Sequence, residues 1–320
     1  MEITTESRMT TTDWLSQDEV KLITLRSDAR AALQVTFNWL LIAAIFWGVS
    51  QWSNPVSWVL GALLLGSRHL GLAILMHEAG HNTLFRTPSL NAAAGKWLCA
   101  YPILSDMHAY ASSHREHHKL AGTPEDPDLP NYQAYPVSPA SFRRKVMRDL
   151  SGRTGMRNLL ALFKGNGGDI MMRGSDRRPP VTQGLLVNAL LFGILLAAGV
   201  GELYLMWVIA FIVFYPLAAR IRQLAEHGCV ADLHDPDPRM NTRTTRANLL
   251  ERLLICPNHV NYHCEHHFMA SVPSYRLKRL HRLLVAKGFY GDHPDTVATG
   301  YLNVLRQALA NTEQPPAASI

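Results

Sequence analysis

The chain has 320 residues, a net charge of +6 and 48% hydrophobic residues. Its four cysteines form no Cys-x-x-Cys pair, which argues against a zinc ribbon, an internal iron–sulfur cluster and a disulfide framework. A basic excess can indicate nucleic-acid binding. Here the apolar residues gather in long runs, so a membrane protein is favoured and no nucleic-acid partner is expected.

The polar segment of residues 1–30 precedes the first of these runs. Within it, Ser16 followed by Glu19 predicts a capping box and a short helix. A membrane-spanning helix needs roughly 20 residues, and soluble core helices rarely run as long without a charge. Four apolar stretches therefore predict transmembrane helices, at residues 31–52, 55–76, 179–201 and 203–219. Only Arg68 interrupts the second stretch.

The links between the stretches predict their orientation. The two short links, around Asn54 and Glu202, contain no basic residue, whereas 30 of the 31 basic residues lie in residues 1–30, 77–178 and 220–320. The positive-inside rule places these three segments, and with them both termini, in the cytosol. We therefore predict an all-α integral membrane protein of one domain, residues 1–320. Two helical hairpins carry a cytosolic helical cap, and the bacterial inner (plasma) membrane is the expected location.

A helix is also expected near the C-terminus. Residues 274–287 place leucines on one face and arginines elsewhere, and Gly288 ends the pattern. The helix is expected either at the membrane interface or in the solvated cap.

Histidines are concentrated in three short boxes. They read HEAGH at residues 77–81, HREHH at 114–118 and HCEHH at 263–267, and His227 follows the fourth apolar stretch. Spacings of three and four place the imidazoles of a box on one helical face. With 15 histidines in 320 residues, HxxHH is expected only about 0.03 times per chain, and it occurs twice.

These histidines are predicted to meet at the cytosolic face. His77 lies 22 residues after Pro55 (77 − 55) and His227 lies 24 after Leu203 (227 − 203), about one membrane thickness from each outer link. The predicted metal ligands are His77, His81, His114, His117, His118, His227, His263, His266 and His267. One first-row metal takes four to six ligands, so nine histidines predict two metal ions.

The ligand type does not name the metal, because imidazole suits iron, zinc, copper and nickel. A dinuclear site at the mouth of a membrane bundle fits O₂ activation on a hydrocarbon held in the bilayer. No catalytic side chain is expected apart from the metal ligands.

Neutral ligands leave the metal charge uncompensated, so polar groups are expected around the site. The candidates are Glu78, Glu116, Glu226, Glu265, Asp128 and, as the holder of a metal-bound water, Gln223. Asp126 is a further candidate, although Asp-Pro pairs also form ordinary turns. That the glutamates pair instead with cap cations stays an open alternative. His281 and His293 lack box spacing and are expected to play no part in the site.

The boxes resemble those of the membrane fatty acid desaturase family, which is related to membrane hydroxylases and carotenoid ketolases. The resemblance runs from about Arg68 to His281, and its most specific parts are NYHCEHH at 261–267, VPSY at 272–275 and GTPEDPD at 122–128. It implies a four-helix membrane bundle under a cytosolic cap with a di-iron centre. It also implies that the box histidines, and His227 after the last span, bind the iron. Box one has Glu78 where Asp is commoner, and box three begins with His263 where several branches have Gln.

The main hypothesis is an O₂-dependent di-iron oxidoreductase that introduces a double bond into a fatty acyl or lipid-like chain. Its two electrons would come from a separate donor of ferredoxin, rubredoxin or cytochrome b5 type with a reductase, since no fused donor is apparent. The alternative is a hydroxylase or ketolase of a lipid or terpenoid with the same site. Remote alternatives are a metal transporter and a zinc protease, because His77-Glu78-x-x-His81 matches HExxH. Chain length, carbon position and head group stay open.

Overall fold

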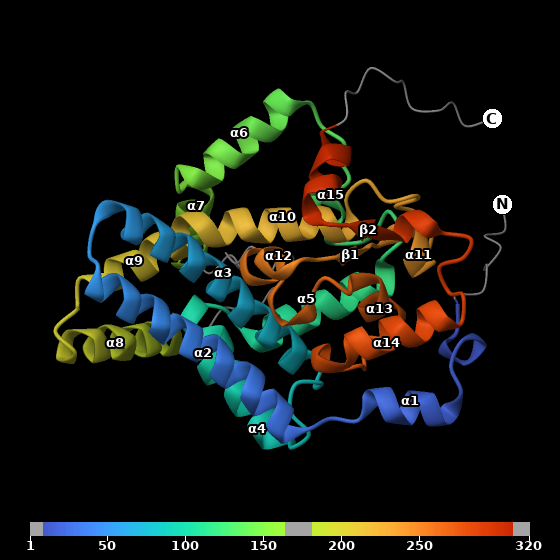
Figure 1. The fold of residues 1–320 in the computed structure, drawn as a ribbon, viewed down its shortest axis with the longest axis horizontal. Helices are drawn as coiled ribbons and strands as arrows, with labels where there is room; N and C mark the ends of the chain where they lie inside the picture. Colours follow the sequence, from blue (N-terminus) through green and yellow to red (C-terminus); the bar gives the residue numbers. More distant parts are fainter. Residues whose placement is uncertain (1–8, 164–180, 310–320) are drawn as a thin grey trace.

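A computed structural model describes residues 9–163 and 181–309, which are mainly helical (Figure 1). The longest apolar helices are α2 (Asp28–Gln51), α3 (Pro55–Gly80) and the continuous run of α9 (Leu203–Ile209), η5 (Ala210–Phe214) and α10 (Tyr215–His227). All three are long and apolar enough to cross a membrane, with mean hydropathies of 1.7, 1.7 and 1.8. The chain is therefore a membrane protein.

A fourth apolar helix, α8 (Val181–Ala197), has 17 residues and is shorter than the predicted stretch of residues 179–201. Residues 179 and 180 lie outside the described residues. At its other end, Gly199 takes a φ of +74°, which ends the helix before the turn into α9. In Figure 1 α8 lies beside α9, and the turn between them is on the same side of the molecule as the turn from α2 to α3.

The turn from α2 to α3 is fixed by a helix cap. The side-chain oxygen of Asn54 accepts hydrogen bonds from the backbone N–H groups of Val56 (3.0 Å) and Ser57 (3.1 Å). Pro55 occupies the first turn, where its missing N–H costs no hydrogen bond. Three residues, Trp52 to Asn54, therefore suffice to reverse the chain.

Both helices that end in metal-ligand candidates are longer than predicted. The second stretch continues as helix from residue 76 to Gly80, and the fourth continues from residue 219 to His227. His77 and His227 thus lie in the last turns of rigid helices. The two helices pack closely at Gly66, whose missing Cβ would lie 2.4 Å from the Cβ of Phe214.

The predicted cap consists of short helices from both ends and the middle of the chain. They are η1 (Thr11–Asp13), α1 (Gln17–Thr24), α4 (Pro88–Ala93), η2 (Ala94–Ala100), η3 (Tyr101–Ile103), α5 (Met107–Leu120), η4 (Leu129–Asn131), α6 (Pro139–Leu150), α7 (Arg153–Phe163), α11 (Pro238–Asn241), α12 (Leu249–Leu254), η6 (Pro257–His259), α13 (His263–Phe268), α14 (Ser274–Ala286), η7 (Pro294–Thr296) and α15 (Tyr301–Ala308). The predicted capping box before α1 is present, since Ser16 and Glu19 exchange their backbone and side-chain hydrogen bonds.

Two parts of residues 77–178 lie beside the apolar helices and do not cover them. The π-helical segment η2 packs on α3, and the indole N–H of Trp39 in α2 donates to the carbonyl of Leu98 (3.0 Å). Helix α7 packs on η5. Both segments are short and α7 begins with arginine, so neither gives the long apolar run by which a membrane segment is detected.

The sequence predicted an all-α fold, but the described residues also include two short strands. Strands β1 (Thr244–Arg246) and β2 (Val297–Thr299) pair in parallel, with Thr244 opposite Val297. Their β-branched residues suit a short extended pair. The pair ties α15 to the segment that follows α11, and an isolated antiparallel bridge joins Thr244 to Tyr262.

Helix α14 matches the predicted residues 274–287 to within one residue. Its buried leucines, Leu277, Leu280 and Leu284, pack in one apolar cluster with Ile23 of α1. The apolar face therefore serves the core of the cap and not the membrane surface.

The first prediction concerns orientation. We expect alkaline phosphatase fused after Asn54 or after Glu202 to be active outside the cytosol, because neither link carries a basic residue. A C-terminal fusion should be inactive with this reporter and fluorescent with a cytosolic one. Phosphatase activity from the C-terminal fusion would contradict the four-span arrangement.

Candidate metal centre

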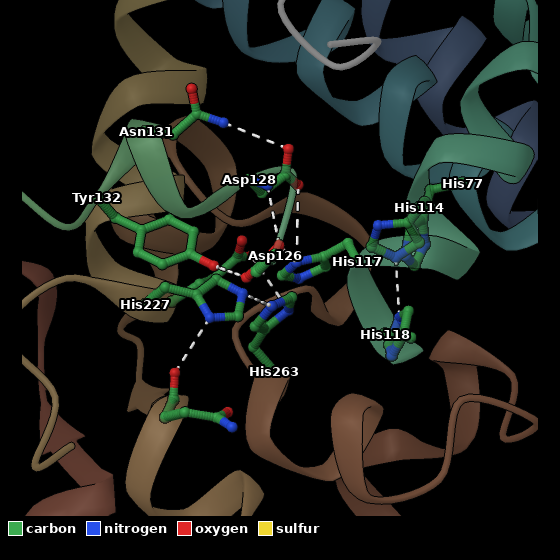
Figure 2. A network of polar contacts seen from close by, with 12 residues as sticks. His77, His114, His117, His118, Asp126, Asp128, Asn131, Tyr132, His227 and His263 are labelled. Carbon is green, nitrogen blue, oxygen red and sulfur yellow. Dashed lines mark hydrogen bonds and ion pairs between the residues drawn. The ribbon is translucent and has the colours of Figure 1, made fainter. Parts of the chain in front are cut away.

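The nine box and span histidines come together as two adjoining groups. One contains His77, His81, His114, His118 and His266, and the other contains His117, His227, His263 and His267. Within each group the nitrogen atoms that could bind a metal all lie within 4.8 Å of one another. Figure 2 shows how α5 and the chain around His227 bring part of both groups together.

The division into two groups follows from helix geometry. Successive residues are rotated by about 100°, so members of an i, i+4 pair point nearly the same way. His114 and His118 of α5 form such a pair in the first group, and His117 between them turns to the second. In α13 the order is reversed: His263 and His267 belong to the second group and His266 to the first.

The nitrogen–nitrogen distances are those of a coordination sphere. In the first group, His114 Nε2 lies 2.8 Å from His77 Nε2 and 2.9 Å from His118 Nε2. In the second, His263 Nε2 lies 2.8 Å from His227 Nε2. Two ligand nitrogens at about 2.1 Å from one metal and at right angles lie about 3.0 Å apart. The rings are therefore already placed as edges of a coordination polyhedron.

One buried Nε2 atom in each group has no hydrogen-bond partner among the described residues, and Nδ1 of His266 in the first group also lacks one. The two Nε2 atoms are those of His81 in the first group and of His267 in the second. A buried polar atom without a partner is costly unless something else satisfies it. A metal ion in each group would satisfy both Nε2 atoms, so the residues present fit two metal ions.

Two of the rings are held by polar contacts at Nδ1, the nitrogen that faces away from the other histidines. Nδ1 of His77 lies 3.1 Å from Glu78 Oε1, and Nδ1 of His227 donates to the carbonyl of Asn241 (3.1 Å). A metal-binding histidine commonly donates its other N–H to a carboxylate or carbonyl, which fixes the tautomer and the ring orientation. Here these contacts leave Nε2 of both rings aimed at the other histidines.

Asp126 supports His117. Its Oδ1 lies 2.8 Å from His117 Nδ1, and its other oxygen accepts from the hydroxyl of Tyr132 (Figure 2). Asp128, the sequence candidate, lies farther from the same nitrogen, at 3.9 Å. The ring of Tyr132 stacks on His227, with centroids 4.7 Å apart. Tyr132 carried no sequence signal, because nothing in its spacing relates it to a box.

The surroundings shift the protonation equilibria of these groups. Burial lowers the pKa of His81 to about 3 and lowers the pKa values of His114 and His266 well below 6.5, so these rings are neutral and able to bind a metal at pH 7. Burial also opposes charge on His117, but the hydrogen bond that His117 donates to Asp126 and the charges of Asp128 and Asp126 outweigh this effect and raise the pKa of His117. A metal ion at His117 would take the place of that proton.

Glu78 links the first box to the cap. Its Oε2 accepts from the backbone N–H of Ser274 (2.8 Å) and from the hydroxyl of Thr83 (3.1 Å). Ser274 is the first residue of α14, so the carboxylate lies at the positive end of that helix. Glu226 occupies a similar place behind box three, with Oε1 3.6 Å from His263 Nδ1 and Oε2 3.4 Å from Arg222 Nε.

The glutamates within boxes two and three point away from the histidine groups. Each is rotated by about 200° from the first histidine of its box and so lies on the opposite face of its helix. Glu116 is largely exposed and lies 3.8 Å from Lys119. The geometry therefore gives it no part in orienting a ligand, contrary to the expectation from the sequence.

Glu265 is fully buried on the far side of α13. Its oxygens accept hydrogen bonds from Thr244 and Tyr290, and Oε1 also contacts His281 Nδ1. It anchors box three to β1 and α14 without touching the ligand candidates. His281, which the sequence left out of the site, belongs to this anchor.

Arg243 holds the end of the helix that carries His227. Its guanidinium donates to the carbonyls of Ala225 (3.2 Å), Gly228 (2.7 Å) and Cys229, and its backbone N–H donates to the carbonyl of Glu226 (2.8 Å). The C-terminal carbonyls of a helix otherwise lack donors. Gln223 lies half-buried one turn before His227. It precedes His227 by four residues, the same spacing as that of His77 before His81.

Comparison with known proteins agrees with this geometry. The model of the fatty acid desaturase family matches residues 53–299, a range that contains all nine histidines. The chain belongs to the fatty acid desaturase family. It is accordingly an oxidoreductase of the desaturase type.

The relatives differ in what their names say they act on. The chain is 28% identical to dihydrorhizobitoxine desaturase of Bradyrhizobium elkanii over 283 residues, 82% of this chain and 78% of the relative. It is 26% identical to an sn-1 acyl-lipid omega-3 desaturase (ferredoxin) of Nostoc sp. (strain 36), over 43% of this chain and 41% of the relative. It is 28% identical to a Delta(12) fatty acid desaturase of Mortierella isabellina, over 31% and 25%.

The second prediction separates the two aspartates. Asp126→Asn removes the charge from His117 without changing the size of the side chain, so we expect metal affinity to fall about 10- to 100-fold. Asp128→Asn should have a smaller effect, since its carboxylate is 3.9 Å and not 2.8 Å from Nδ1. Bound metal is measured by elemental analysis across a chelator series. Equal losses in the two variants would contradict the assignment to Asp126.

Proposed function

We propose that the protein is an O₂-dependent di-iron desaturase that introduces a double bond into a fatty acyl or lipid-like hydrocarbon chain. The observation that carries the proposal is the division of nine histidines into groups of five and four, each with a buried Nε2 that lacks a partner. Family membership supports iron as the metal. With both irons bound and reduced, the centre would supply the O₂ chemistry that removes two hydrogens from adjacent carbons.

The nine histidines would hold the irons, and the remaining residues would orient them. His77, His81, His114, His118 and His266 would bind one iron, and His117, His227, His263 and His267 the other. The second group has one ligand fewer, and Gln223, with the spacing to His227 that His77 has to His81, would hold a water molecule at that iron. Glu78, Glu226 and Asp126 supply the negative charge that nine neutral rings lack.

The substrate would approach from the membrane. The site lies at the ends of α3 and α10, whose other ends form the apolar bundle. A hydrocarbon held beside the bundle would therefore reach the irons without crossing water. Two relatives are named for acyl lipids or fatty acids and one for dihydrorhizobitoxine, which leaves the head group open within the lipid-like class. Both termini and the site would face the cytosol of a bacterial inner membrane.

The geometry disfavours the zinc protease hypothesis. A general base must face the metal-bound water, yet both oxygens of Glu78 are engaged behind His77, with Thr83 and Ser274 on one of them. In addition, His77 and His81 share their group with three further histidines, which leaves no open zinc position.

The third prediction tests the ligands. His117→Ala, His227→Ala and His266→Ala should each lower iron below two per chain and abolish substrate oxidation, because each removes one ligand from a buried neutral set. His234→Ala is the control, since this exposed histidine lies outside both groups. Iron is measured by elemental analysis and the product by lipid profiling of a host expressing each variant. Full iron and activity in His266→Ala would refute the di-iron proposal.

Glu78→Gln distinguishes the rival chemistry. A zinc protease would lose its general base and nearly all activity while keeping its metal. In the di-iron protein, loss of the Glu78 carboxylate, which contacts His77, should lower iron affinity or activity about 10- to 100-fold. Zinc retention together with loss of a proteolytic activity would support the rival.

The fourth prediction concerns the electron donor. Purified protein given iron, O₂ and substrate should turn over poorly until a ferredoxin, rubredoxin or cytochrome b5 with its reductase is added. The relative named as a ferredoxin desaturase makes ferredoxin the first donor to assay. Product formed per enzyme is measured over many turnovers. Sustained turnover without any donor would count against the proposal.

A further inference from the structure

Helix α7 presents an exposed face of mixed character. Arg153 and Arg157 lie on this face together with Met156, Leu160 and Phe163, which are 43%, 52% and 55% exposed. The spacing is that of one helical stripe. The cations occupy the beginning of the stripe, and the large apolar side chains extend to its end.

This face lies beside the apolar part of the last span. Gly155 packs directly on that span, because a Cβ there would lie 2.2 Å from the backbone oxygen of Ile212. Ile212 is eight residues before Arg220 (220 − 212), which places the crossing about 12 Å along the helix on the membrane side of that arginine. Gly152, with a φ of +74°, makes the sharp turn that brings α7 into this position.

Within the part of the chain that the structure describes, the two arginines pair with no carboxylate. Asp149, the buried acid at the start of this region, accepts from Arg220 (Nη2 to Oδ1, 3.0 Å) and from Thr154. Neither Arg153 nor Arg157 forms an ion pair with any residue in the described ranges 9–163 and 181–309. Two guanidinium groups beside a lipid-facing helix are costly unless an anion compensates them.

A groove of about 600 Å³ runs along this face. It is lined by Ser151, Gly152, Arg153, Met156, Arg157, Leu160, Ala161 and Ile212. One end is polar and cationic, and the rest is apolar. The most abundant membrane component with a matching shape is a phospholipid, whose phosphate is anionic and whose tails are apolar.

We propose that this groove binds an anionic phospholipid of the leaflet next to the histidine site. Arg153 and Arg157 hold the phosphate through charge-assisted hydrogen bonds, and an acyl chain lies along Leu160 and Ile212. The site is separate from the metal centre, so its occupancy does not depend on iron or on the proposed reaction.

The test uses delipidated full-length protein in a neutral detergent. Binding of phosphatidylglycerol, phosphatidylcholine and inorganic phosphate is measured by native mass spectrometry and by the shift in Tm. We expect saturable binding of phosphatidylglycerol and no saturable binding of phosphatidylcholine or inorganic phosphate. The double variant Arg153→Gln/Arg157→Gln should weaken phosphatidylglycerol binding about 30-fold, because each cation near an anionic lipid contributes about fivefold.

The matched control is Arg143→Gln/Arg144→Gln in α6, which removes the same charge from exposed positions outside the groove. It should leave the affinity for phosphatidylglycerol unchanged. Leu160→Gln should weaken lipid binding through the acyl chain alone, and it tests the site even if the double variant fails to fold. Equal losses in both double variants, equal binding of phosphatidylcholine, or tight binding of inorganic phosphate would each overturn the proposal.

Discussion

The structure depends on the burial of nine imidazoles whose nitrogens face one another. Such nitrogens lose their water on folding, and three of them gain no hydrogen bond among the described residues: Nε2 of His81, Nε2 of His267 and Nδ1 of His266. A metal ion bound in each group would compensate that cost, and metal binding would then also stabilise the folded chain. The histidines are placed on helix ends because a coordination sphere tolerates little positional error, and the ends of α3 and α10 are continuous with the rigid bundle.

The cap is organised by the hydrogen bonds behind these rings. The backbone N–H of Ser274 fixes Glu78, the carbonyl of Asn241 fixes His227, and Asp126 fixes His117. Two of these bonds also join separate segments: Ser274 to Glu78 links α14 to α3, and His227 to Asn241 links α10 to α11. Arg243 adds the C-terminal cap of α10, without which the helix end bearing His227 would fray. The same hydrogen bonds thus orient the histidine rings and hold segments of the cap together.

The sequence was sufficient to predict which histidines come together, but not which residues hydrogen-bond to them. Box spacing predicted eight of the nine residues that meet, because i, i+3 and i, i+4 positions share a helical face wherever the helix lies, and the length of the last apolar stretch predicted His227. The division of the histidines into groups of five and four depends on which helix lies opposite each of them. Neighbouring His117 and His118, for example, belong to different groups. Asp126 and Asp128 looked equivalent in the chain, and only the fold brings one of them to 2.8 Å from His117. Glu116 failed as a candidate since its helix face meets solvent, whereas the equivalent Glu265 is buried.

Continuous helices connect the apolar bundle directly to the histidine groups. The 26 residues of α3 include both an apolar span and His77, so the depth of the site is set by residue number and not by a flexible linker. Segment η2 packs on the same helix beside Trp39, and the chain then turns at Leu104 into α5, which supplies three of the nine histidines. A shift of the bundle in the bilayer would therefore move α3 and α5 together and leave the distances between their histidines unchanged.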